Sequence, residues 1–441
     1  MPRSPIGRRR LARLGAQTLV ATVLTSAFGI LTRILVARNL GVAATGLYAA
    51  AIIVPPLLFV AGNFGLNVSA IHFIGERRLP VSKVVANVFS ATISSGIFLS
   101  LAWVIAMHFF PRFSPAAHDW KALFAIALCI PAVFITSSAS AVLQGGMKIG
   151  YLNLLSLIAP MLLCVVAVVL FLTHQMTYSA VLITWTAGNI VSAACGLLLT
   201  RSVAAWHLGF SGQILRPLMR LGAVGYCSNI GGYLGRRVDV FLVQGISGSK
   251  ELGYYAVAYG LAELLWYVAQ SLGTVLSPVV AGASERNANA MTGAVCRHTF
   301  AILMVCSVGL VLAGGPLIRL TFGAAFLPSV APLRWIVLGI VSGGVDKILC
   351  ADLIGRGKLH IGLQSSWLAV VVNIIANLTL IPRWGANGAA ISSSISYTVG
   401  AAYTLFFYLR VSGSSLRETL WVSGSDAKVI FRLIGRYCGN K

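Results

Sequence analysis

The residues best suited to chemistry in this chain are ionisable side chains placed inside long apolar stretches. Four of its 33 basic residues lie there, namely Arg33, Arg236, Arg237 and Lys347. The acidic residues that fall in such stretches are Asp239, Glu263 and Asp346. An ionisable group near the centre of a bilayer costs roughly 2.5–3.5 kcal/mol. Each of these residues therefore indicates a water-filled cavity, an ion partner or a function.

Arg33, Arg236 and Arg237 are suited to hold an anionic phosphate ligand. A guanidinium group stays charged and offers a planar fork of donors that matches phosphate oxygens. A cavity lined by these three side chains would attract pyrophosphate. For Arg33 the alternative is that its side chain extends to the outer headgroups near Arg38.

The acidic residues leave two interpretations open. Arg236 and Asp239 are three residues apart, so on one helix face they could form a salt bridge and leave Arg237 for a substrate or for Glu263. Glu263 or Asp346 could carry a coupling proton, or could be a structural carboxylate paired with arginine. Asp346 and Lys347 are adjacent and point to different helix faces, so they are expected to line a cavity or couple ions rather than neutralise each other.

The composition places the chain in lipid. Its residues are 58% hydrophobic and 10% charged, and the mean hydropathy is +0.87, whereas a soluble domain has about 25% charged residues. The net charge of +23 would suggest nucleic-acid binding in a soluble protein. Here the basic residues lie in short loops between apolar runs, so membrane lipids are the expected partners and nucleic acid is not.

The sequence predicts an all-α membrane protein with about 12 transmembrane helices. A span needs ~20 mostly apolar residues to cross a core ~30 Å thick. The stretches that qualify are 15–38, 45–73, 84–110, 118–143, 150–173, 179–200, 217–244, 253–281, 293–316, 329–354, 360–381 and 387–410. The first is expected to be a retained helix, because it is long and has no signal-peptide cleavage site.

The distribution of basic residues predicts the orientation. With a cytoplasmic N-terminus, 22 basic residues fall on the cytoplasmic side, four fall within spans, and the outer side holds Arg38, Arg112, Lys121, Lys250, Arg319, Arg334 and Arg383. This bias predicts a multi-pass protein of the bacterial inner membrane with both termini in the cytoplasm.

An internal duplication is visible when the sequence is shifted by 207 residues. The shift places Gly41, Gly46, Tyr48, Ala49, Ala51, Leu57 and Leu58 on Gly248, Gly253, Tyr255, Ala256, Ala258, Leu264 and Leu265. It predicts two six-helix lobes related by a pseudo-two-fold axis along the membrane normal, with substrate between them. The expected parts are a basic cytoplasmic tail (1–14), an N-terminal lobe (15–200), a cytoplasmic linker (201–216), a C-terminal lobe (217–410) and a second basic tail (411–441).

Sequence patterns of known catalytic sites are absent. The chain has no G-x-S-x-G motif, Walker loop or dinucleotide fingerprint, and its histidines and cysteines lack metal-ligand spacing. We therefore expect no catalytic residue, no metal and no other cofactor, and the chain is not expected to be an enzyme.

Short glycine-based motifs carry a family resemblance. They are RNLG at 38–41, GLY at 46–48, NFGL at 63–66, LQG at 143–145, RVD at 237–239, LGYY at 252–255 and WGANGAA at 384–390. Together they resemble the polysaccharide-biosynthesis flippases, the Wzx-type branch of the multidrug/oligosaccharidyl-lipid/polysaccharide exporter (MOP) superfamily. The resemblance covers about 15–410.

The resemblance implies alternating access around a cationic cavity. The implied cargo is an oligosaccharide repeat unit linked to undecaprenyl pyrophosphate, flipped for exopolysaccharide, O-antigen (lipopolysaccharide) or capsule assembly. Proton or sodium coupling is implied as well, and so are partners among the polymerase and glycosyltransferases of the same pathway. Related lipid II flippases tend to carry two further helices, for which twelve spans leave no room.

Two other functions are alternatives for a chain of this kind. A multidrug or metabolite antiporter of the same superfamily would need acidic cavity walls for a cationic cargo. A membrane-embedded polysaccharide polymerase or ligase would resemble its relatives in a large periplasmic loop. No loop between the expected spans exceeds roughly 20 residues, which favours a transporter over an enzyme of that kind.

Overall fold

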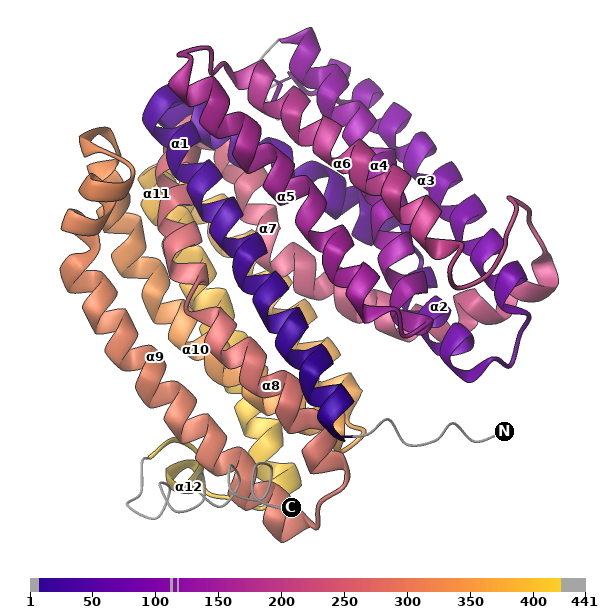
Figure 1. The fold of residues 1–441 in the computed structure, drawn as a ribbon. Helices are drawn as coiled ribbons and strands as arrows, with labels where there is room; N and C mark the ends of the chain where they lie inside the picture. Colours follow the sequence, from indigo (N-terminus) through magenta and orange to yellow (C-terminus); the bar gives the residue numbers. More distant parts are fainter. Residues whose placement is uncertain (1–7, 112–113, 117–118, 422–441) are drawn as a thin grey trace. The chain divides into compact units, whose positions relative to one another are not determined.

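The structure is a computed structural model that describes residues 8–111, 114–116 and 119–421. These residues form helices and, within the described ranges, no strand (Figure 1). The helices are α1 (Arg8–Gly62), α2 (Leu66–Glu76), α3 (Val81–Phe109), α4 (Trp120–Gly145), α5 (Ile149–Leu172), α6 (Tyr178–Thr200), α7 (Gly212–Glu263), α8 (Trp266–Ala281), α9 (Glu285–Thr321), η2 (Ala324–Ser329), α10 (Val330–Gly355), α11 (Leu359–Ser412) and α12 (Leu416–Leu420). The predicted all-α class is confirmed.

The described helices make the chain a multi-pass membrane protein. Eight of them are long and apolar enough to cross a membrane, or nine when the bent pair Asn229–Glu263 and Trp266–Ala281 counts as one span. This number is lower than the predicted twelve because α1, α7 and α11, with 55, 52 and 54 residues, each run through two predicted spans. The count of twelve therefore stays a prediction.

Each of these long helices contains one glycine with a non-helical backbone. The φ and ψ angles are 76° and −174° at Gly41, 84° and 176° at Gly248, and 53° and −126° at Gly385. All three glycines lie between two predicted spans, and such positive φ values are costly for residues with a Cβ atom. Gly41 and Gly248 are aligned by the internal duplication and have nearly the same angles, so the local repeat has a structural counterpart.

Polar side chains fix the backbone at two of these breaks. The hydroxyl of Thr45 donates to the carbonyl oxygen of Gly41 over 2.7 Å. The carboxylate of Glu251 accepts a hydrogen bond of 2.9 Å from the backbone N–H of Ala386, beside Gly385. Freed backbone groups are costly in a membrane, and these bonds satisfy some of them.

The chain divides into two compact units, Met1–Tyr233 and Leu234–Lys441. The division falls inside α7, so the first part of this helix belongs to unit 1 and the second part to unit 2. The sequence instead places the linker between the lobes at 201–216, and that division remains a prediction.

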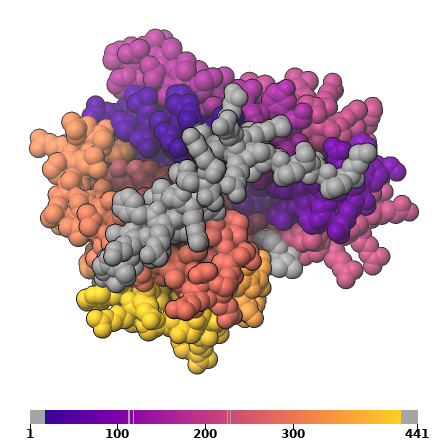
Figure 2. All heavy atoms as spheres, turned by 60° about the horizontal axis from the view of Figure 1, so that its bottom comes forward, coloured from indigo at the N-terminus to yellow at the C-terminus, as the bar shows by residue number. Residues whose placement is uncertain are grey.

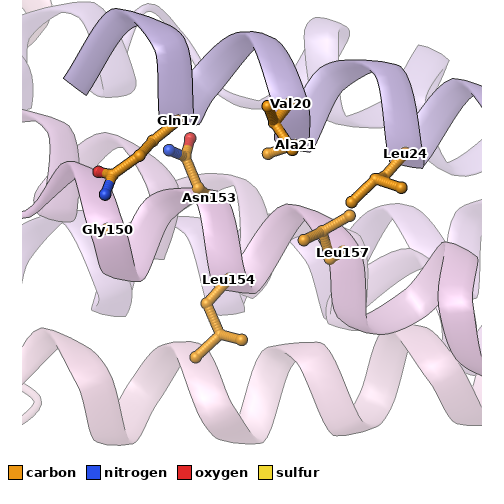
Figure 3. Close-up of a pocket in the computed structure, with 8 residues that line it drawn as sticks. All are labelled: Gln17, Val20, Ala21, Leu24, Gly150, Asn153, Leu154 and Leu157. Carbon is orange, nitrogen blue, oxygen red and sulfur yellow. The ribbon is translucent and has the colours of Figure 1, made fainter. Parts of the chain in front are cut away.

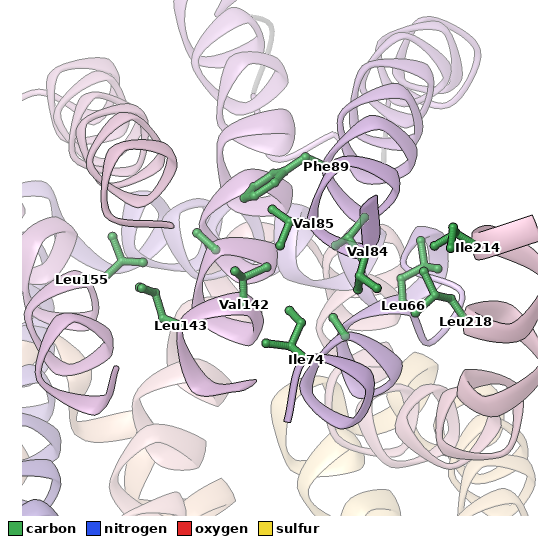
Figure 4. Packing of buried hydrophobic residues seen from close by; sticks show 13 residues of the cluster. Leu66, Ile74, Val84, Val85, Phe89, Val142, Leu143, Leu155, Ile214 and Leu218 are labelled. Atoms are coloured by element: carbon green, nitrogen blue, oxygen red, sulfur yellow. The ribbon is translucent and has the colours of Figure 1, made fainter. Parts of the chain in front are cut away.

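Unit 1 is held together by an apolar cluster that joins α2, α3, α4, α5 and the start of α7 (Figure 4). At α7, Leu218 packs into this cluster and its carbonyl oxygen accepts a hydrogen bond of 2.5 Å from the hydroxyl of Ser69. The backbones of Gly65 and Gly222 are so close that a Cβ atom on either would overlap the other. This close packing explains why the start of α7 belongs to unit 1.

In unit 2, α10 packs against α8, α9 and α11. At one end of this bundle, Asp352 is fully buried, forms an ion pair of 2.6 Å with Arg356, and accepts a hydrogen bond of 3.0 Å from Thr292. Helix α12 packs against α9, and Nδ2 of Asn289 on α9 donates to the carbonyl oxygen of Ser412 at the end of α11 over 2.7 Å. Figure 2 shows this yellow end of the described chain beside salmon-coloured segments. These polar contacts hold the helix ends in fixed positions.

The glycine breaks lead to a stability prediction. Gly248→Ala is expected to lower the free energy of unfolding by about 1–3 kcal/mol, because alanine is strained at a φ of 84° although the space is open. In helix α9, Gly309 also has open space, and Gly309→Ala is expected to be neutral or stabilising by up to about 1 kcal/mol. Thermal denaturation of the two purified variants checks this. Equal destabilisation by both substitutions would contradict it.

Candidate functional site

An arginine in the middle of α7 and the glutamate at the end of this helix form the centre of the site in unit 2. The Nη2 atom of Arg237 donates to Oε1 of Glu263 over 2.7 Å. The two residues are 26 positions apart in α7, so the break at Gly248 folds the second half of the helix back alongside the first. The guanidinium carbon of Arg237 also lies 5.0 Å from the centre of the Tyr259 ring.

The ion pair faces an accessible space. The side chains of Arg237 and Glu263 keep 23% and 22% of their surface exposed. By comparison, the carboxylate of Asp352 in the ion pair with Arg356 is 0% exposed. A ligand group can therefore approach the guanidinium of Arg237.

A lysine adds positive charge to the same region. The Nζ atom of Lys347, on α10, donates to Oε1 of Gln270 over 3.0 Å and lies 5.0 Å from the centre of the Trp266 ring. Lys347 also interacts electrostatically with Arg236 and Glu263. Three cationic side chains, Arg236, Arg237 and Lys347, thus lie within electrostatic reach of Glu263, and Asp239 and Asp346 interact with Arg237 and Lys347 as well. Among these groups the guanidinium of Arg237 offers forked donors that suit an anionic ligand.

Asp239 lies close to the arginines but in a sealed polar core. It is fully buried and accepts hydrogen bonds from the hydroxyl of Tyr255, from the hydroxyl of Ser393 over 3.0 Å, and from the backbone N–H of Val240 over 2.8 Å. The salt bridge with Arg236 that the spacing allowed is replaced by these donors. The carboxylate is therefore solvated by the protein itself.

Buried amides and hydroxyls occupy the same helix, α11. The Nδ2 atom of Asn377 donates to Oδ1 of Asn373 over 2.8 Å, and the Nδ2 atom of Asn373 donates to Ser396 over 3.2 Å. Asn373 and Ser396 lie on opposite sides of the break at Gly385, so their bond links the two halves of α11.

Asp346 and Arg33 are placed differently from the residues above, although Asp346 interacts electrostatically with Lys347. Asp346 lies 3.6 Å from Sγ of Cys350, which is 3.9 Å from the hydroxyl of Thr404, so it faces a different side of α10 from Lys347. Arg33 belongs to unit 1, where it is exposed and interacts electrostatically with Tyr48. Its membership of one site with Arg236 and Arg237 stays a prediction.

Site roles were not predicted from the sequence for Tyr255, Tyr259, Trp266 or Ser393. One signal could have found the first two, because Tyr255, Tyr259 and Glu263 are spaced four residues apart and share a helix face. Ser393 could not have been found in this way, because it reaches Asp239 from 154 residues further along the chain.

A groove between α1 and α5 of unit 1 has a different character (Figure 3). Its volume is about 490 Å³, and Gln17 and Asn153 lie at one end while Leu24 and Leu157 meet at the other. Its eight lining residues carry no ionisable group, so it does not suit a phosphate. Among the described residues, no group of three or more His, Cys, Asp or Glu side chains could hold a metal ion.

Long apolar helices that carry charged side chains define a multi-pass membrane protein. Residues 34–331 match the model of the polysaccharide biosynthesis protein family. Because this match covers more than half of the sequence, the chain belongs to that family.

Named relatives agree with this assignment. A protein of Haloferax volcanii described as a probable low-salt glycan biosynthesis flippase, Agl15, is 22% identical over 396 residues, which cover 88% of this chain and 81% of the relative. A putative O-antigen transporter of Shigella flexneri is 24% identical over 401 residues, which cover 85% of this chain and 92% of the relative.

The fold is also found in a solved structure. The lipid II flippase MurJ in an inward closed conformation superposes with a TM-score of 0.76 at 18% identity, and the match covers 95% of this chain and 92% of MurJ. At this identity the likeness concerns the fold alone.

The hydroxyl donors around Asp239 lead to a second prediction. Tyr255→Phe removes one donor from a fully buried carboxylate and is expected to cost about 1–3 kcal/mol of stability. Tyr259→Phe is the matched control, because its hydroxyl makes a contact of 3.5 Å with Tyr397 and its loss is expected to cost under about 1 kcal/mol. Thermal denaturation of both variants checks the difference. An equal cost for the two would show that the Tyr255 hydroxyl does not stabilise Asp239.

Proposed function

We propose that the chain is a flippase that moves oligosaccharide linked to undecaprenyl pyrophosphate from the cytoplasmic to the periplasmic leaflet of the bacterial inner membrane. The observation that carries the proposal is the accessible guanidinium of Arg237, held at membrane depth near Arg236 and Lys347. The family, and the printed descriptions of the relatives as a glycan biosynthesis flippase and an O-antigen transporter, support this cargo class.

The charge of the site favours an anionic cargo. Pyrophosphate oxygens accept hydrogen bonds from the guanidinium fork and are attracted by the lysine ammonium. Asp239 is buried and Asp346 is partly buried, so a cationic drug would meet the partly exposed guanidinium of Arg237 with Glu263 as its accessible counter-charge. The proposed cargo therefore fits the site better than the cargo of such an antiporter.

The proposal includes an arrangement of the whole chain. Twelve spans form two six-helix lobes, 15–200 and 217–410, which rock about a shared chamber and leave both termini in the cytoplasm. The glycine breaks between predicted spans and the bias of basic residues towards one side support it. Arg33 contributes to the chamber from the first lobe.

Ion coupling is proposed at the carboxylates of unit 2. Asp239 is buried among hydroxyl groups and interacts electrostatically with Arg237. A change in the charge of Asp239 would therefore change the electrostatic potential at the arginine. Asp346, on α10, is the second candidate. Protons or sodium ions passing through these groups would drive the cycle.

Transport by reconstituted protein tests the proposal. The purified protein in vesicles is expected to move lipid-linked oligosaccharide between the two leaflets. Movement to the inner leaflet is measured as protection of the sugar from an external glycosidase. Empty vesicles serve as the control. Vesicles in which the protein leaves the lipid on its original leaflet would overturn the proposed function.

The guanidinium of Arg237 leads to a third prediction. Arg237→Lys keeps the charge but loses the forked donors, and it is expected to lower the flipping rate about ten-fold, the usual effect of losing one charge-assisted hydrogen bond. Arg410→Lys is the matched control, since Arg410 lies near the end of α11 over Phe406 and away from the site of unit 2. A normal rate for Arg237→Lys, with normal membrane insertion, would contradict a phosphate contact at this residue.

A further inference from the structure

We propose that the carboxylate of Glu263 occupies the phosphate position on Arg237 when no cargo is bound, and moves to Lys347 when the cargo phosphate arrives. This inference rests on the proposed function and adds to it a residue that regulates the binding site. Glu263 would thus bind Arg237 in the empty transporter and would also promote release of the cargo.

The first step is that carboxylate and phosphate compete for the same donors. Oε1 of Glu263 accepts from Nη2 of Arg237 over 2.7 Å, as a phosphate oxygen would. The Tyr259 ring, 5.0 Å from the guanidinium carbon, stacks against one face of the arginine. Ligands must therefore approach the edge of the guanidinium, part of which Glu263 already holds.

The second step is that this ion pair is open to exchange. Its two side chains are 23% and 22% exposed. The structural pair of the same unit, Arg356 with Asp352, is 12% and 0% exposed and is tied further by Thr292 and Asn289. A partly exposed pair contributes little stability of its own, so a stronger anion can displace its carboxylate.

The third step is that the displaced carboxylate has another partner. An unpaired charge at membrane depth is costly, and displacement would be blocked if Glu263 had nowhere to go. The ammonium of Lys347 is bound by Gln270 and the Trp266 ring, which follow Glu263 by seven and three residues, and Lys347 interacts electrostatically with Glu263 as well as with Asp346. A lysine has a flexible stem, so we assign it as the second partner of the displaced carboxylate.

The consequence concerns turnover. A transport site must bind its cargo strongly enough to capture it and weakly enough to release it. When Glu263 returns to Arg237, it displaces the phosphate and regenerates the empty site. Loss of the carboxylate should therefore tighten binding and slow release.

The experiment compares wild type with Glu263→Gln, which keeps the shape of the side chain and removes its charge. Binding of inorganic pyrophosphate to the purified full-length chain is measured by calorimetry, and flipping of lipid-linked oligosaccharide is measured in vesicles. We expect the variant to bind pyrophosphate about three- to ten-fold more tightly, the effect of one partly exposed ion pair. Its maximal flipping rate and its half-saturating cargo concentration should both fall.

A double-mutant cycle tests the move to Lys347. Lys347→Gln alone should weaken pyrophosphate binding, because the displaced carboxylate loses its second partner. In the Glu263→Gln background the same substitution should weaken binding much less, because no carboxylate remains to be received and only the attraction between the lysine and the phosphate is lost. Equal weakening in both backgrounds would overturn this step and show that Lys347 contacts the phosphate itself.

The control is Glu251→Gln, which neutralises another carboxylate of α7, bound to the backbone N–H of Ala386, and should leave pyrophosphate affinity unchanged. Unchanged or weaker binding by Glu263→Gln would overturn the inference, while flipping by wild type would still support the proposed function. Tighter binding without any flipping by wild type would overturn the proposed function instead. If Glu263→Gln is not recovered folded, Glu263→Asp withdraws the carboxylate by one methylene and should change affinity in the same direction.

Discussion

A charge inside a hydrocarbon layer needs a partner or water, and unit 2 is organised around that requirement. Asp239 is satisfied by the hydroxyls of Tyr255 and Ser393, so its charge is enclosed by the protein. Arg237 and Glu263 satisfy each other but remain accessible. The same requirement thus yields one carboxylate that the protein solvates and one partly exposed ion pair, and this difference supports the proposed binding role of Arg237.

This arrangement depends on helices that reverse direction at a single glycine. Arg237 and Glu263 belong to one helix of 52 residues and meet because Gly248 interrupts it. Gly385 does the same in α11, where Asn373 meets Ser396. A conventional loop would leave more backbone groups without partners near the membrane. The glycine breaks therefore position the polar side chains with little irregular backbone.

The spans and the charged residues within them could be predicted from the sequence, because both follow from hydropathy along the chain. The positions of Arg237, Glu263 and Lys347 were found in this way, and so were the segments around Gly41 and Gly248. The partners of Asp239 could not be found, because Tyr255 and Ser393 approach it only through tertiary packing of distant segments. The continuity of α1, α7 and α11 was also missed, since a single glycine in a short connection does not distinguish a helix break from a loop.

The internal duplication distinguishes residues that both halves share from charged residues that occur in the second half. Thr32 corresponds to Asp239 under the shift of 207 residues, and the pair Gly29 and Ile30 corresponds to Arg236 and Arg237. Tyr48 and Tyr255 are both buried, and the backbone breaks at Gly41 and Gly248 are alike. The helix–glycine–helix segment around each break is therefore common to both halves. Because Pro56 corresponds to Glu263 under this shift, the repeated segment of the first half has no counterpart of the Arg237–Glu263 ion pair. The repeated segment is thus a structural unit of the fold, and the Arg237–Glu263 ion pair belongs to its second copy.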